Sequence, residues 1–142
     1  MPFFNQDIAR LVQDNSFFRQ EVHSFFRQEV HTAEHSQLVV MSVEPGDDIG
    51  EEVHEVDQVL VFVSGQGEAV LNGERSPVGA NSLVIVPAGT RHNFVNTGQE
   101  PMKLFTVYAP PEEEPGTLHR DKAEAEAAEA EKAEVRAAPE RR

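Results

Sequence analysis

Short apolar runs alternate with turn-forming residues along the middle of the chain, from Gln37 to Pro110. Runs rich in Val, Leu, Ile and Phe that are bounded by Gly, Pro and Asn are typical of β-strands. Asn72-Gly73 follows one such run, and this pair accepts the positive φ angles that a tight hairpin requires. The pattern predicts an all-β sandwich or barrel. The segments that carry the runs are QLVVMSV, VLVFVSGQGEAVLNGE, SLVIVPAGT and KLFTVYAPP.

The segments on both sides of this strand-rich region have a different composition and hydrophobic pattern. Near the N-terminus, apolar residues recur at helical spacing and predict a short helix or turn. After Pro110, PPEEEPG predicts a linker, and DKAEAEAAEAEKAEVRAA predicts a helix that Pro139 ends. Because the apolar positions of this helix are nearly all Ala, we expect it to be solvated or, alternatively, to dock on a partner subunit. The N-terminal apolar residues are Phe4, Ile8, Leu11 and Val12.

The octapeptide SFFRQEVH occurs twice in succession, at residues 16–23 and 24–31. Since eight is even, a strand can contain both copies without moving its side chains to the other face. We interpret the first copy as the surplus member of a neutral tandem duplication. The alternative is an extended arm that pairs with a neighbouring subunit. In neither case do we expect the repeat to carry the chemistry.

These differences in composition and hydrophobic pattern divide the chain of 142 residues into three predicted parts. Residues 1–35 form an N-terminal segment, residues 36–111 a barrel, and residues 112–142 a linker with a helical tail. No apolar run is long enough to span a membrane, and the N-terminus lacks the apolar core of a signal peptide. With no Cys either, a cytoplasmic protein is expected. A net charge of −13 disfavours nucleic acid as a partner.

The candidate chemistry lies in GDDIGEEVHEVDQVLVFVSG. In a strand, Glu52, His54 and Gln58 would share one face, which Leu60 and Phe62 continue as core. Burying such polar groups costs several kcal/mol each unless a metal or a polar substrate compensates. His92, after a Pro-Ala-Gly turn, can join Glu52, His54 and Gln58 if its strand lies beside the strand that carries them.

Other polar and aromatic residues are given less weight. Arg91 is expected to be a surface charge, His35 a turn residue and His119 a residue at the start of the tail helix. We expect Phe94, Phe105 and Tyr108 to pack in the core or at the rim. No general acid or base stands apart from the candidate metal ligands unless His35 or Tyr108 reaches the cavity. An acidic run near the barrel mouth would repel strongly anionic substrates; it comprises Glu44, Asp47, Asp48, Glu51, Glu55 and Asp57.

Two stretches of the chain resemble the paired motifs of the cupins, which are small double-stranded β-helix (jelly-roll) barrels. The first is Gly46-DDIGE-Glu52-Val53-His54-EVD-Gln58-VLVFVS-Gly65, and the second is Pro87-Ala-Gly89-Thr-Arg-His92-Asn-Phe-Val-Asn96. Both have the cupin spacing, and they occur in the cupin order. The resemblance covers roughly residues 36–110 and is nearest to short single-domain, RmlC-like cupins. It implies a jelly-roll barrel with a short N-terminal helix or arm and a C-terminal helical tail.

The resemblance also implies a metal site, with departures. Glu52 stands where the family has its first His, Gln58 where it has Glu, and Asn81 where a Gly is expected. The implied ligands are Glu52, His54, Gln58 and His92, of which Gln58 is a weak ligand that would serve to orient a bound water. Without Gln58, two His and one carboxylate have the composition of a facial triad for Fe(II), and the same groups suit Mn, Ni or Zn.

Two functional hypotheses follow. The first is a metal-dependent enzyme acting on a small polar molecule, by isomerisation of a sugar derivative or by oxidative chemistry. The second is a cupin module that binds a small ligand without converting it, and the fold alone does not choose between them. A homodimer is also expected, because the outward residues of the metal-site strand are apolar and need cover. These are Val53, Val59, Val61 and Val63.

Overall fold

The structure, a computed structural model, describes residues 3–13 and 25–137, with side chains to residue 132. Nine strands and two helices follow one another in this part of the chain. The elements are α1 (Ile8–Gln13), β1 (Arg27–Thr32), β2 (Gln37–Val43), β3 (Asp57–Ser64), β4 (Gln66–Leu71), β5 (Glu74–Gly79), β6 (Leu83–Val86), β7 (His92–Asn96), β8 (Met102–Ala109), β9 (Leu118–His119) and α2 (Lys122–Ala137).

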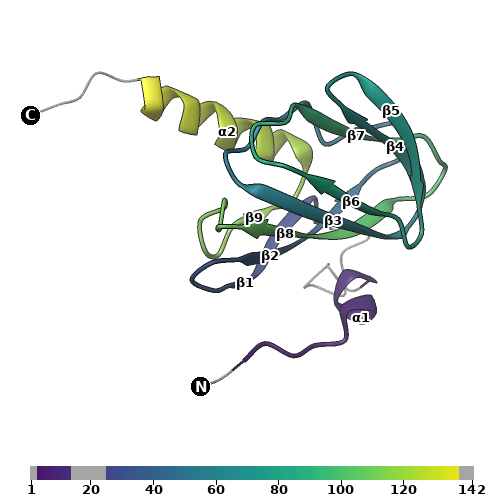
Figure 1. The fold of residues 1–142 in the computed structure, drawn as a ribbon, viewed down its shortest axis with the longest axis horizontal. Coiled ribbons are helices and arrows are strands. Elements are labelled where there is room, and N and C mark those ends of the chain that lie inside the picture. The colour runs from purple at the N-terminus through teal and green to yellow at the C-terminus, as the bar shows by residue number, and fades with distance from the viewer. Residues whose placement is uncertain (1–2, 14–24, 138–142) are drawn as a thin grey trace, which may run out of the picture.

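The strands form two antiparallel sheets that enclose the core. One sheet has six strands in the order β6-β3-β8-β2-β1-β9, and the other has three in the order β5-β4-β7. Figure 1 shows the smaller sheet on one side of the larger one and α1 on the other side. The predicted all-β jelly-roll barrel, with a short helix near the N-terminus and a helix near the C-terminus, is confirmed.

The inward face of the large sheet changes from apolar to polar along its length. Met41, Phe62 and Leu104 are almost fully buried and pack in the core cluster. At the other end of the same face, Tyr108 lies opposite Gln58 on β3 and also opposite Gln37 on β2. A site at this end of the barrel is therefore bordered by the apolar core on one side and lies next to the polar residues Gln37, Tyr108 and Gln58.

One turn confirms the prediction of a tight hairpin, and a second explains a departure from the cupin motif. Asn72 and Gly73 have φ angles of 49° and 85° and join β4 to β5 as a tight hairpin. Asn81, which replaces an expected Gly, has a φ angle of 72°. Asn is one of the few residues other than Gly that adopt this left-handed conformation readily. The departure at Asn81 therefore preserves the backbone turn that a Gly would make.

The tail forms the predicted helix, but the helix docks on its own barrel. Asp121 caps it by accepting a hydrogen bond from the Glu124 backbone at 2.9 Å. Ala125 is 4% exposed and belongs to the core cluster. Lys132 donates to Glu113 at 3.2 Å. The expected solvated helix is therefore partly wrong, since Ala125 is buried against the barrel. Docking of α2 on a partner subunit stays a prediction.

At the other flank, β1 contains the second copy of the duplicated octapeptide from Arg27 to His31. The first copy lies outside the described residues. Within the described part of the chain, neither helix is long and apolar enough to cross a membrane.

Candidate metal centre

The segment before β3 changes partners between the two sheets. Glu52 forms an isolated bridge with His92, whose strand belongs to the three-stranded sheet. Their backbones exchange hydrogen bonds of 2.8 and 2.9 Å. Residue 57 then begins β3 in the six-stranded sheet. The single strand expected through Glu52 and Gln58 is therefore interrupted, because the chain turns the corner between sheets at this point.

This corner brings three of the four predicted ligands together. One potential ligand atom from each of Glu52, His54 and His92 lies within 4.8 Å of the others. The rings of His54 and His92 have centroids 5.2 Å apart, and His54 Nε2 lies 3.7 Å from Glu52 Oε1. Both histidines are buried, whereas the Glu52 side chain is 16% exposed. Two imidazoles and a carboxylate thus converge at the mouth of the barrel.

Both histidines are oriented through their Nδ1 atoms. His92 Nδ1 lies 2.9 Å from the Thr90 carbonyl, which can only accept, so Nδ1 carries the proton. His54 Nδ1 lies 3.3 Å from Glu112 Oε1. Both Nε2 atoms are buried without a hydrogen-bond partner among the described residues. Metal-binding histidines are held in this manner, with the second nitrogen fixed by a carbonyl or carboxylate.

Gln58 is oriented by a chain of two hydrogen bonds. The Thr106 hydroxyl donates its only proton to the Val59 carbonyl at 2.9 Å. Its oxygen can therefore only accept from Gln58, whose Nε2 lies 3.1 Å away. This direction fixes the amide and leaves Gln58 Oε1 buried without a partner in the described part of the chain. The predicted fourth residue thus offers a free oxygen from the polar end of β3.

A buried arginine supports the carboxylate of the site, and the sequence analysis missed it. Arg27 is 1% exposed and its guanidinium lies 3.8 Å from Glu52 Oε2 and 3.7 Å from Glu113 Oε1. Arg27 Nη1 also lies 3.4 Å from His119 Nδ1. His119, which precedes the tail helix as expected, is therefore buried in β9 beside Arg27 and does not decorate the N-terminus of that helix. The pairing of β1 with β9 places Arg27 opposite His119.

The linker contributes Glu112 and Glu113 because Gln37 holds it against the barrel. Gln37 Oε1 accepts from the Glu113 backbone at 2.9 Å, and its Nε2 donates to the Glu113 carbonyl at 2.7 Å. Glu112 can then reach His54 and Glu113 can reach Arg27. The sequence of three Glu residues does not predict contacts with His54 and Arg27, since such a run is equally typical of a solvated linker.

The pKa values at the site reflect burial and the surrounding carboxylates. Burial lowers the pKa of His54, but Glu112 and Glu52 outweigh it and raise the pKa to about 9. Burial raises the pKa of Glu52, whereas the His54 imidazole, 3.7 Å away, and the charge of Arg27 bring it below the usual range. The pKa of His92 is lowered, first by burial and further by His54. Burial raises the pKa of Tyr108 above its usual range, so this phenol stays protonated.

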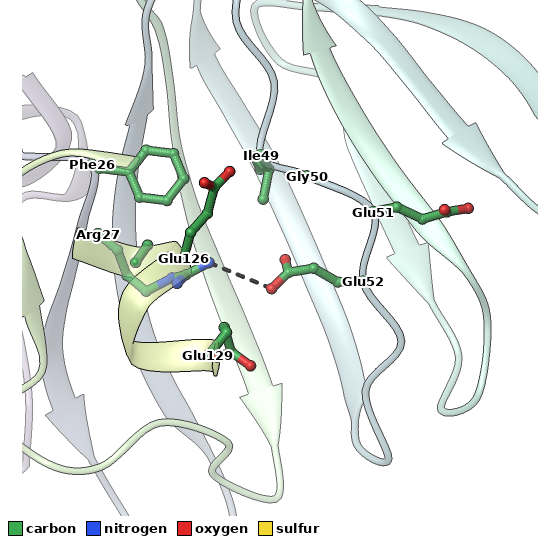
Figure 2. A pocket seen from close by; sticks show the side chains of 9 residues that line it. Phe26, Arg27, Ile49, Gly50, Glu51, Glu52, Glu126 and Glu129 are labelled. Carbon is green, nitrogen blue, oxygen red and sulfur yellow. Dashed lines mark ion pairs between the residues drawn. The ribbon is translucent and has the colours of Figure 1, made fainter. Parts of the chain in front are cut away.

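A pocket of about 280 Å³ opens beside the site, between α2 and the segment before β3. Arg27 and Glu52 point toward one another across it in Figure 2, and their ion pair is drawn there as a dashed line. Glu126 and Glu129 line it from α2, and Glu51 lines it from the opposite side. Apart from Arg27, the charged groups lining this pocket are carboxylates, which disfavours entry of strongly anionic molecules.

The other residues weighed from the sequence lie as follows. Arg91 is an exposed surface charge 3.7 Å from Glu51, as expected. His35 lies in the turn between β1 and β2, with its side chain 87% exposed. Of the acidic run, Asp47 and Asp48 form ion pairs with Lys122 of α2. Tyr108 is buried next to the candidate site, with its ring edge-on to His54 at 5.5 Å.

Comparisons with known proteins agree with this architecture. A family model for the cupin domain matches residues 39–108. YrkC, an uncharacterized protein of Bacillus subtilis, is 45% identical over 134 residues, which cover 89% of this chain and 67% of that protein. The crystal structure of BH2720 from Bacillus halodurans matches with a TM-score of 0.80 and 34% identity, over 87% of this chain and 93% of that one.

A more distant structure, an RmlC-like cupin from Shewanella frigidimarina, matches with a TM-score of 0.57 and 21% identity. It covers 61% of this chain and 77% of that one, and the likeness concerns the fold alone. The two sheets and the corner that carries the candidate site define a jelly-roll barrel of the RmlC-like type. This chain belongs to the cupin superfamily.

Proposed function

We propose that this cupin is a metal-dependent enzyme that acts on a small polar molecule, sugar-like or oxidisable. Glu52, His54 and His92 would hold a divalent ion, with Gln58 as a fourth ligand or as the group that orients a bound water. Fe, Mn, Ni and Zn all suit this set of nitrogen and oxygen donors. When bound, such an ion supplies a Lewis acid or, for Fe, a centre for O₂ chemistry.

One observation carries the proposal. His54 Nε2, His92 Nε2 and Gln58 Oε1 are all buried without a hydrogen-bond partner in the described residues. Buried polar atoms are nearly always paired, because an unpaired one costs about 1–3 kcal/mol. Three such atoms beside a carboxylate at one end of the barrel therefore fit a metal ion as their common partner.

The chain's own residues would prepare the site in three ways. Glu112 and the Thr90 carbonyl hold the two imidazoles through Nδ1, which points each Nε2 inward. Arg27 pairs with Glu52 Oε2 and so limits the rotation of that carboxylate. The hydroxyl of Thr106 fixes the Gln58 amide. These partners reduce the conformational freedom that metal binding would otherwise have to remove.

Elemental analysis of protein purified without an affinity tag tests metal binding. We expect near-stoichiometric metal in the parent and its loss in His54→Ala and in His92→Ala. His35→Ala is the matched control, because this histidine is exposed on a turn, and it should retain the metal. A metal-free parent, even after incubation with Fe(II), Mn, Ni and Zn, would contradict the proposal.

Turnover distinguishes an enzyme from a ligand-binding module. Small sugars and oxidisable acids would be assayed with the metal-loaded parent, with and without O₂. We expect metal-dependent product formation that Glu52→Ala and His92→Ala abolish while both variants remain folded by circular dichroism. Saturable binding without product, in air and without it, would instead favour the module.

A further inference from the structure

Tyr108 is a fully buried phenol at the polar end of the barrel interior. It is 0% exposed and lies on β8, directly opposite Gln58 on β3. Opposite residues of antiparallel strands share a face, so both side chains point into the barrel. On its other side, the ring meets His54 edge-on at 5.5 Å. Tyr108 is therefore next to two of the side chains proposed to hold the metal.

The polar neighbours of Tyr108 do not pair with its hydroxyl. Gln37 uses its amide nitrogen and its amide oxygen on the backbone of Glu113. Gln58 uses its amide nitrogen on Thr106. The Tyr108 hydroxyl is buried and has no hydrogen-bond partner within the described ranges of the chain. Since buried hydroxyls are nearly always paired, the partner is expected in a bound molecule.

We propose that the Tyr108 hydroxyl donates a hydrogen bond to the small molecule that binds at the metal. This inference rests on the proposed function and adds a specificity-determining residue to it. The unpaired hydroxyl favours a ligand with an acceptor oxygen, such as a carbonyl, carboxylate or hydroxyl oxygen, because a neutral phenol can donate its proton. Tyr108 would thus select oxygen ligands and orient them next to the ion.

The parent protein provides a direct test, because the chain has one Tyr and no Trp. The tyrosine absorption band in the near ultraviolet therefore reports on Tyr108 alone. A phenol that begins to donate a hydrogen bond shifts this band to longer wavelength. We expect acetate, an oxygen ligand transparent in this range, to produce such a shift in the Zn(II)-loaded protein but not in the metal-free protein.

Affinity measurements on Tyr108→Phe provide the second test. With Co(II) in the site, the visible spectrum reports both loading by the metal and binding of acetate. We expect Tyr108→Phe to bind Co(II) as the parent does and to bind acetate roughly tenfold more weakly, the effect of one lost hydrogen bond. A role confined to packing would leave the acetate affinity unchanged.

Ser42→Ala is the matched control. Its hydroxyl is also buried without a hydrogen-bond partner among the described residues. It lies on β2 opposite Lys103, five positions along from Gln37 and hence roughly 16 Å from the site at the rise of a strand. Loss of this hydroxyl should leave the acetate affinity as in the parent.

The possible results separate this inference from the proposed function. A parent that binds no Co(II) and no Zn(II) overturns both. A parent that binds the metal overturns this inference alone if acetate does not bind, if the tyrosine band does not move, or if Tyr108→Phe binds acetate as tightly as the parent. A band shift in the Zn(II)-loaded protein together with weakened binding in Tyr108→Phe, but not in Ser42→Ala, supports it.

Discussion

Glu52 and Gln58, the two departures from the cupin ligand pattern, each contact a residue that complements the new side chain. Glu52 replaces a neutral His with a negative carboxylate, and Arg27 supplies a positive charge 3.8 Å away. Gln58 replaces a carboxylate with an amide, and Thr106 orients this amide so that its oxygen is free. A site that had lost its role would have no need of either partner, so the replacements fit an altered donor set.

The raised pKa of His54 predicts a pH dependence for the metal-free protein. His54 has an ordinary pKa of 6.5 and a pKa of about 9 in the fold, where Glu52 and Glu112 face it and Arg27 and His92 lie nearby. Protonated His54 stabilises the fold fully at pH values below the ordinary pKa of 6.5. This stabilisation is lost as the pH rises through the pKa of about 9 that His54 has in the fold. We expect the free energy of unfolding to fall by about 3 kcal/mol from about pH 6.5 to about pH 9.5.

Urea unfolding of EDTA-treated protein at several pH values measures this effect. His54→Gln removes the titrating group and should flatten the dependence over the same interval. Equal slopes in the parent and in His54→Gln would show that the charge of His54 contributes nothing to stability. Metal must be absent in this experiment, since a bound ion would stabilise the native state by itself.

The sequence led to the candidate ligands but not to the residues that hold them. Glu52, His54 and His92 were found by alternation and by the motif, and the structure brings them together. Arg27 and Glu112 approach the site only through tertiary structure: β1 must pair with β2 and β9, and Gln37 must clamp the linker. Such contacts leave no local periodicity, so no pattern within one segment could have indicated them.

At the scale of elements, α2 shows where compositional reasoning fails. Ala and Glu predicted the helix correctly, but the same composition suggested that the helix had little to bury. Ala125 nevertheless joins the core cluster, because a small side chain lets the helix backbone approach the barrel. Lys122 and Lys132 then pair with Asp48 and Glu113 on the barrel and the linker. The helix thereby forms one wall of the pocket beside the candidate site.

Ala125→Glu should detach α2 from the barrel. A carboxylate placed in this buried position would lack a partner, and we expect a loss of about 3 kcal/mol in the free energy of unfolding. Ala127→Glu is the control, because residue 127 is exposed on the same helix and the change has the same charge and helix propensity. Urea unfolding and limited proteolysis would measure the two effects. Similar stabilities for the two variants would contradict the docking of α2 as a stabilising contact.

For the whole molecule, the outward face of the six-stranded sheet is an apolar surface with one exposed edge. Two rows of apolar side chains cross four adjacent strands. They are Ile85-Val59-Val107-Leu38 and Leu83-Val61-Phe105-Val40. α1 contacts β2 and β8, whereas at the β6 edge Leu83 is 61% exposed and Ile85 is 58% exposed. Neither row contains a charged residue, although the chain has a net charge of −13.

We predict that a second copy of the chain covers this face. An uncharged, apolar sheet face is complementary to itself, and two copies related by a twofold axis would bury it on both partners. Size-exclusion chromatography with light scattering should give the mass of a dimer for the parent. Leu83→Glu should give a monomer, whereas Thr97→Glu, a change at an exposed residue that follows β7 of the other sheet, should not. A parent that is monomeric at every concentration, or a dimer that Leu83→Glu leaves intact, would show that this face is not the interface.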